Sequence, residues 1–180
     1  MKGKKVLWIT KTAVFLALLI VLQAGSRMFG QLVTGSLVNL TLIICVMTCG
    51  MSSGAVIALC SPVLAKLIGI GPLWTIIPFV MFANLVLIMI WRFVGMIKIA
   101  NKHIVRLFTL IIAAACKFTA LYAGVVKLAL PLFLDLQPKQ EAVISAMFSL
   151  NQLFTALIGG AAATVILPVL EKSILRNEKE

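Results

Sequence analysis

Acidic residues and histidine are scarce in this sequence. Its 180 residues include five aspartates and glutamates and one histidine, His103. All five acids lie outside the long apolar runs or at their ends. The chain has no HExxH sequence and no GxxxxGK[ST] phosphate loop, and its four cysteines show no metal-like CxxC spacing. These absences argue against an enzyme, an ATPase and a metal protein, and we expect no cofactor.

Apolar residues, in contrast, are abundant. They make up 62% of the chain, with a mean hydropathy of +1.16, whereas soluble domains are about 45–50% apolar. A transmembrane helix needs roughly 20 mostly apolar residues. The candidate runs are Val6–Ala24, Leu32–Thr48, Gly54–Ile70, Leu73–Val94, Val105–Leu128 and Ala142–Leu170. The sequence therefore predicts an all-α integral membrane protein, with residues 1–180 forming a single domain, a compact bundle of six transmembrane helices.

The 16 lysines and arginines, which give a net charge of +11, are unevenly distributed. Eleven lie before the first run or at its start, between the fourth and fifth runs or at their facing ends, or after the sixth. The other loops and run ends hold three, Arg27, Lys127 and Lys139, and Lys66 and Lys117 lie within runs. Because cytoplasmic loops carry an excess of basic residues, both termini are expected in the cytoplasm. The charges form no stripe with interleaved aromatics, so we expect membrane lipid and no nucleic acid as a partner.

Lys117 lies near the centre of the fifth run, where no acid can pair with it. Intramembrane charges usually face the bundle interior or a water-filled cavity. At 1.5 Å per residue, Asn84, Asn151 and Gln152 lie at a similar depth, and Asn39 somewhat nearer the outside. We favour a polar binding cavity over interhelical hydrogen bonding without a ligand. Lys117 would be neutral, held by carbonyls and amides, or paired with a ligand's anionic group.

Small residues form two further patterns. Ala113, Ala120 and Gly124 share the face of Lys117 and leave space for a ligand or a neighbouring helix. In the first run, Ala13 and Ala17 form an AxxxA face, which allows close packing within this chain or against another membrane subunit. At the outer end of the fourth run, Trp74 could cover the cavity or anchor the helix at the membrane interface.

Six short helices with both termini inside, the AxxxA face and polar residues in helices four to six resemble the substrate-binding S components of energy-coupling factor (ECF) transporters. These proteins take vitamins and similar micronutrients into bacteria. The segments GSLVNLTLIICVMTCGMSSGAVIALCSP and PFVMFANLVLIMIWR share the rhythm of that family, and the resemblance covers essentially the whole chain. It implies a multi-pass protein of the bacterial plasma membrane that captures a micronutrient from outside.

The resemblance also implies roles for particular residues. In the family, substrate binds toward the outer side and the loop between the first two helices acts as a lid, which here is GSRMFGQ with Arg27 and Gln31. The family's alanine face meets a transmembrane T subunit that is coupled to two ATPases, and this role carries over to Ala13 and Ala17. Binding residues differ between subfamilies, so those in the membrane rest on the depth argument.

Two other classes remain open. A structural or assembly subunit would use its polar residues to join helices and would bind no ligand. A stand-alone secondary carrier often couples transport to intramembrane carboxylates, and none is present in the apolar runs. Within the favoured class, Lys117 predicts a small, anionic, vitamin-like substrate.

Overall fold

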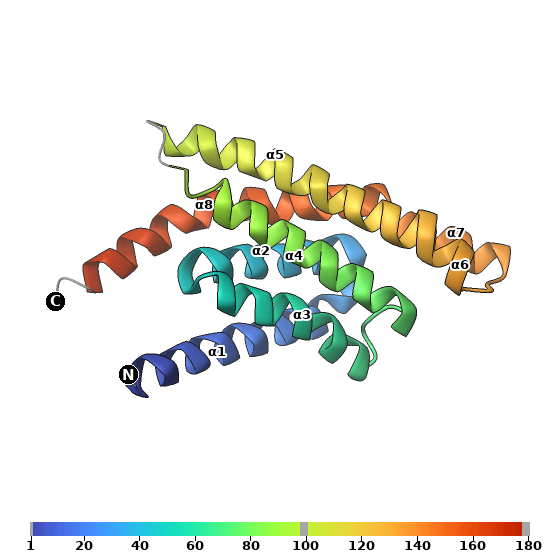
Figure 1. Cartoon of the computed structure of the whole chain (residues 1–180), viewed down its shortest axis with the longest axis horizontal. Coiled ribbons are helices and arrows are strands. Elements are labelled where there is room, and N and C mark those ends of the chain that lie inside the picture. Colours follow the sequence, from blue (N-terminus) through green and yellow to red (C-terminus); the bar gives the residue numbers. More distant parts are fainter. Residues whose placement is uncertain (1, 98–100, 178–180) are drawn as a thin grey trace.

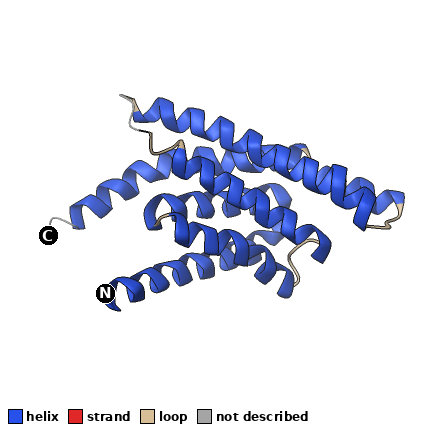
Figure 2. Ribbon diagram, in the orientation of Figure 1, coloured by secondary structure: helices blue, strands red, loops and turns tan. Residues whose placement is uncertain are grey.

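The computed structural model describes residues 2–97 and 101–177, and these residues form helices and turns without a strand (Figures 1 and 2). The long helices are α1 (Lys2–Ser26), α2 (Gly30–Cys49), α3 (Met51–Leu67), α4 (Ile77–Phe93), α5 (Lys102–Leu121) and α8 (Leu150–Asn177). Shorter elements are the 3-10 turns η1 (Arg27–Phe29) and η2 (Trp74–Ile76), the π-helix η3 (Tyr122–Ala129), α6 (Leu130–Phe133) and α7 (Pro138–Met147). The all-helical prediction is confirmed.

Within the described residues, four helical segments are long and apolar enough to cross a membrane: Gly3–Cys49, Trp74–Phe93, Lys102–Phe133 and Pro138–Leu170. The apolar helix Met51–Leu67 is shorter. The first segment has 47 residues, more than twice the roughly 20 needed for one crossing. It contains α1 and α2, which pack against each other because the chain reverses at η1 (Figure 1).

The ends of several predicted helices differ from those observed. The run Ala142–Leu170 is interrupted between α7 and α8, where Phe148 and Ser149 form a turn. The third helix begins earlier than predicted. It also ends earlier, because Gly69, at a φ of 76°, terminates α3. At this end the amides of Ile70 and Gly71 both donate to the carbonyl of Ala65.

α2 is the central helix of the bundle and packs against α1, α3, α4 and α8, while α5 packs against α4 and α8. The close approach of α2 and α8 depends on glycine. A Cβ at Gly159 would lie 2.5 Å from the Ser36 carbonyl oxygen and 2.8 Å from the Asn39 Cβ, and one at Gly35 would lie 2.7 Å from the Thr155 Cγ2. A larger residue at Gly159 would meet backbone atoms of α2, and one at Gly35 would displace the Thr155 side chain.

A cluster of buried apolar side chains fills one part of the bundle, which we call the packed half. Its members are Leu19, Leu42, Ile43, Cys45, Val46, Ile57, Ala58, Leu87, Ile88, Trp91, Leu110, Ala113, Ala163 and Leu167. A second, smaller cluster of Ile76, Ala83, Leu121, Val125 and Phe148 joins α4 and η3 to the turn before α8.

The bundle has two distinct ends. Figure 1 shows the start of α1, the end of α4, the start of α5 and the end of α8 toward one end, and η1, the α3–α4 connection and α6–α7 toward the other. The elements at the first end carry most of the basic residues of the described chain: Lys4, Lys5, Lys11, Arg92, Lys102, Arg106 and Lys172. The loops are therefore grouped as the charge distribution predicts.

Candidate functional site

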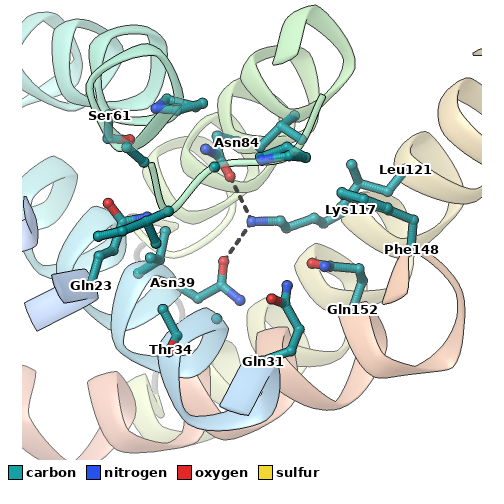
Figure 3. A pocket seen from close by; sticks show the side chains of 18 residues that line it. Gln23, Gln31, Thr34, Asn39, Ser61, Asn84, Lys117, Leu121, Phe148 and Gln152 are labelled. Atoms are coloured by element: carbon teal, nitrogen blue, oxygen red, sulfur yellow. Dashed lines mark hydrogen bonds between the residues drawn. The ribbon is translucent and has the colours of Figure 1, made fainter. Parts of the chain in front are cut away.

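A cavity of about 110 Å³ lies between the helices toward the η1 end (Figure 3). Side chains from α1, α2, α3, α4, α5 and α8 meet there, together with the α3–α4 connection and the turn before α8. The lining residues are Gln23, Gln31, Thr34, Gly35, Val38, Asn39, Ser61, Pro62, Ala65, Ile70, Gly71, Pro72, Val80, Asn84, Lys117, Leu121, Phe148 and Gln152. Polar side chains thus converge on one space within an otherwise apolar bundle.

Lys117 is 3% exposed and extends from α5 into this cavity. Its Nζ donates to Asn39 Oδ1 at 2.5 Å and to Asn84 Oδ1 at 2.7 Å (Figure 3). Of the three states expected from the sequence, the structure shows the lysine held by amides. Among the lining residues Lys117 is the one with a charged side chain, and none is a carboxylate. The cavity therefore has a positive or a donor character at this point.

A hydrogen-bonded chain connects Lys117 to α8. Asn39 Nδ2 donates to Thr155 Oγ1 at 3.4 Å, and Thr155 Oγ1 donates to the Gln152 carbonyl oxygen at 3.0 Å. The side chain of Gln152 also lines the cavity and donates from Nε2 to the Met147 carbonyl oxygen at 3.1 Å. Because Asn39 Nδ2 is engaged by Thr155, the orientation of Asn39 Oδ1 toward Lys117 is fixed.

The remaining predicted site residues divide into two groups. Gln31 lines the cavity from the first turn of α2. Asn151, Trp74 and Arg27 do not line it: all three are exposed, and Asn151 donates to the Ala146 carbonyl oxygen at 3.2 Å. Asn151 and Gln152 have nearly the same depth but face different directions, because successive helical residues are rotated by about 100°.

The small face of α5 is occupied by neighbouring side chains. Ala113 belongs to the packed half, and a Cβ at Gly124 would lie 2.7 Å from the Phe79 ring. The space beside this face could have been filled by a ligand or by a neighbouring helix. At Gly124 it is filled by α4, through the Phe79 ring. The cavity lies instead at the Lys117 side chain, where α1, α2, α3, α4 and α8 also contribute lining residues.

The expected lid, GSRMFGQ, folds as a tight turn. It comprises the end of α1, the three-residue η1 and the start of α2. Gly30 has a φ of 84°, a backbone conformation that side chains resist, and it allows α2 to begin directly after η1. Across the turn, Thr34 Oγ1 donates to the Ser26 carbonyl oxygen at 3.1 Å. Gln31 is the member of this segment that reaches the cavity.

Sequence reasoning missed Gln23, Thr34 and Ser61, which all line the cavity. Gln23 Oε1 and Ser61 Oγ are buried and have no hydrogen-bond partner. A signal was present, because Gln23 interrupts the apolar run LLIVLQA and Ser61 interrupts ALCSPVLA. In the described part of the chain, no three histidine, cysteine or acidic side chains lie close enough to hold a metal ion.

These features describe a multi-pass helical membrane protein with a polar cavity built around a buried lysine. The family profile for the substrate-specific component of ECF transporters matches residues 8–171, which is most of the 180-residue chain. The chain belongs to this family, whose members are transport subunits and not enzymes. No curated protein and no solved structure gives a match.

Proposed function

We propose that this S component captures a small, anionic, vitamin-like micronutrient in the cavity around Lys117. It would take the substrate from outside a bacterial plasma membrane and deliver it together with a T subunit and two ATPases. The observation that carries the proposal is the buried lysine, which contacts two amide oxygens and no carboxylate among the described residues.

The chemistry of the amino group supports an anionic ligand. An ammonium has three donors, and the two bonds to Asn39 and Asn84 leave one donor available for the cavity. Neither amide neutralises the charge. An ion pair with a substrate carboxylate would do so in a site shielded from water, where the attraction is strong and the loss of the carboxylate's hydration offsets part of it. The amides would then fix the position of the lysine rather than compete with the substrate.

The proposed topology has six crossings within one domain: α1, α2, α3, α4, α5 with η3, and α8. At 1.5 Å per residue, the 17 residues of α3 span about 26 Å, close to the hydrocarbon thickness of about 30 Å. The basic end of the bundle would face the cytoplasm, with both termini there. The cavity lies toward the opposite end, which supports substrate entry from outside.

For assembly, we propose that Ala13 and Ala17 form the surface that meets the T subunit. Both are exposed on α1, next to the exposed apolar residues Val14, Leu18 and Val21. Small side chains on an apolar helix face let a partner helix approach closely. Replacing both alanines with leucine should reduce co-purification with the T subunit and leave ligand binding intact. A stand-alone carrier would have no such dependence.

Lys117→Met tests the substrate site. Methionine keeps the length of the side chain and removes its charge. Losing a shielded ion pair costs about 3–5 kcal/mol, so affinity for a carboxylate ligand should fall by about 10²- to 10⁴-fold. Binding would be measured by thermal shift and calorimetry on the full chain in detergent, first with a panel of carboxylate vitamins and precursors and then with their amides.

Lys127→Met is the matched control. Lys127 lies on the same continuous helical segment, is exposed and stacks over Tyr122 with Nζ 5.6 Å from the ring centroid, outside the cavity. This variant should bind as wild type does. The proposed role of Lys117 is wrong if Lys117→Met retains wild-type affinity, or if ligands bind equally well as acids and amides.

A further inference from the structure

Two buried polar atoms that lack partners lie in the same cavity. Within the described residues, three buried side-chain atoms have no hydrogen-bond partner: Gln23 Oε1, Ser61 Oγ and Trp91 Nε1. Gln23 and Ser61 line the cavity, whereas Trp91 belongs to the packed half. Buried polar groups are nearly always hydrogen-bonded, because leaving one unpaired costs free energy. Two such atoms in one cavity leave two hydrogen-bonding positions that a bound molecule can satisfy.

Ser61 differs from the other hydroxyl residues in these helices. Ser36, Thr41, Thr48 and Thr109 each donate to the carbonyl oxygen four residues earlier, at 2.7–2.8 Å. The same acceptor exists for any serine within a helix. Ser61, at 1% exposure and also within a helix, makes no such bond. Its hydroxyl is therefore available to the cavity.

Gln23 and Ser61 approach the cavity from a different side than the stem of Lys117. Figure 3 shows Lys117 entering from α5, while Gln23 on α1 and Ser61 on α3 lie across the cavity from that stem. Asn39 and Asn84 flank the ammonium between them. A ligand whose anion contacts Lys117 would thus present another part of its structure to Gln23 and Ser61.

The chemistry of the two atoms specifies that part. The amide oxygen Gln23 Oε1 only accepts hydrogen bonds, whereas a serine hydroxyl both donates and accepts. One hydroxyl on the ligand can donate to Gln23 and accept from Ser61. A methyl or ether group could not satisfy Gln23 Oε1. The cavity volume of about 110 Å³ is below the roughly 300 Å³ of the smallest typical pockets for drug-sized ligands.

We propose that the substrate is a compact hydroxy acid, whose carboxylate contacts Lys117 and whose hydroxyl group is recognised by Gln23 and Ser61. This inference rests on the proposed function and adds the second recognition point. Gln23 and Ser61 then determine specificity. A site that hydrogen-bonds a substrate hydroxyl discriminates strongly against analogues that lack it, because its own buried polar groups are left unpaired.

Matched probe series test this assignment on the full chain in detergent. The probes are the ω-hydroxy acids from 3-hydroxypropanoate to 6-hydroxyhexanoate, the corresponding alkanoates and the ω-methoxy acids. At the best-fitting length, the hydroxy acid should bind wild type at least about tenfold more tightly than either analogue. Because the probes cover several chain lengths, the result does not depend on choosing one length in advance. Calorimetry or thermal shift measures the affinities.

Variants then locate the effect. Gln23→Leu and Ser61→Ala should each reduce the preference for the hydroxyl, and the double variant should abolish it, because the hydroxy acid loses its partners and the alkanoate no longer leaves buried polar groups unpaired. Gln140→Leu is the control, because Gln140 is exposed on α7 outside the cavity. Ser61→Ala removes one atom, so its result remains interpretable if the double variant does not fold.

The outcomes separate the two proposals. Alkanoates that bind through Lys117 without any preference for a hydroxyl would mean that water satisfies Gln23 and Ser61, and the hydroxy-acid assignment would be overturned. A preference that persists in both single variants would overturn it as well. If no acid binds wild type, or if Lys117→Met binds acids equally well, the proposed function fails and the further inference fails with it.

Discussion

The same helices build two regions of opposite character. On α2, Asn39 faces the cavity, whereas Leu42 and Val46 lie in the packed half. On α4, Asn84 and Trp91 are divided in the same way, two turns apart. Polar residues on these helices, gathered toward the η1 end, therefore line a cavity beside the packed half. Under the proposed function, the packed half would hold the helices in position while the cavity changes occupant.

Hydrogen bonding shows the same division. Toward the basic end, Thr12 Oγ1 on α1 donates to Ser53 Oγ on α3 at 2.8 Å, so two buried hydroxyls satisfy each other. In the cavity, Gln23 on α1 and Ser61 on α3 have no partner, although they come from the same two helices. One pair joins the helices, and the other leaves two polar atoms without partners at the cavity.

The largest loss of stability is expected when Lys117 loses its hydrogen-bond acceptors in the cavity. The double variant Asn39→Leu/Asn84→Leu leaves the Lys117 ammonium without acceptors. Two hydrogen bonds to a charged group are lost, and the free energy of unfolding should fall by about 3–5 kcal/mol. Chemical unfolding in detergent measures the loss. Adding Lys117→Met should restore most of the lost stability, since apolar groups then replace the whole cluster. If the triple variant is as unstable as the double variant, Lys117 is not the cause of the loss.

An intermediate loss of stability is expected at the boundary between the packed half and the cavity. Gly159→Ala places a Cβ against the Ser36 carbonyl oxygen and Asn39. Overpacking of this kind typically costs about 1–3 kcal/mol, and a shift of Asn39 should also weaken carboxylate binding. Gly25→Ala is the control, because no heavy atom lies within 4 Å of its added Cβ, and it should be neutral or slightly stabilising. Equal stability of the two variants would contradict the tight α2–α8 approach.

The smallest effects on stability compare the bonded hydroxyl of Thr12 with the unpartnered hydroxyl of Ser61. Thr12→Val leaves the buried Ser53 hydroxyl without its hydrogen-bond partner and should lower the free energy of unfolding by about 1 kcal/mol. Ser61→Ala removes a hydroxyl that has no partner, so the ligand-free protein should keep its stability or gain slightly. Unfolding of both variants without ligand checks the difference. A larger loss for Ser61→Ala than for Thr12→Val would mean that Ser61 has a structural role.

Much of this arrangement follows from local sequence properties. Apolar run length predicted helices throughout the chain, and depth counting placed Asn39, Asn84 and Lys117 at levels where they do meet. Depth is a coordinate along a helix, however, and a cavity also requires the direction of each side chain. That direction depends on how neighbouring helices rotate and pack, which explains why Asn151 and Trp74 were included and Gln23 and Ser61 were missed.

The lid prediction came from the family resemblance, and sequence could not specify the turn that the structure shows. A segment with two glycines and few apolar residues is compatible with a mobile loop or with a tight reversal. The positive φ of Gly30 and the bonds between Ser26 and Thr34 give the reversal. Likewise, the break at Phe148–Ser149 has no glycine or proline to mark it, and Phe148 packs into the second cluster there.

The two amides beside Lys117 have a consequence for the turnover of a transporter. Under the proposed function, a substrate must leave as readily as it arrives, and an ammonium left unpaired inside a membrane would resist that departure. Asn39 and Asn84 accept from the lysine, so the release of a substrate would leave the ammonium with two acceptors. The same amides would then hold the lysine in position for the next substrate molecule.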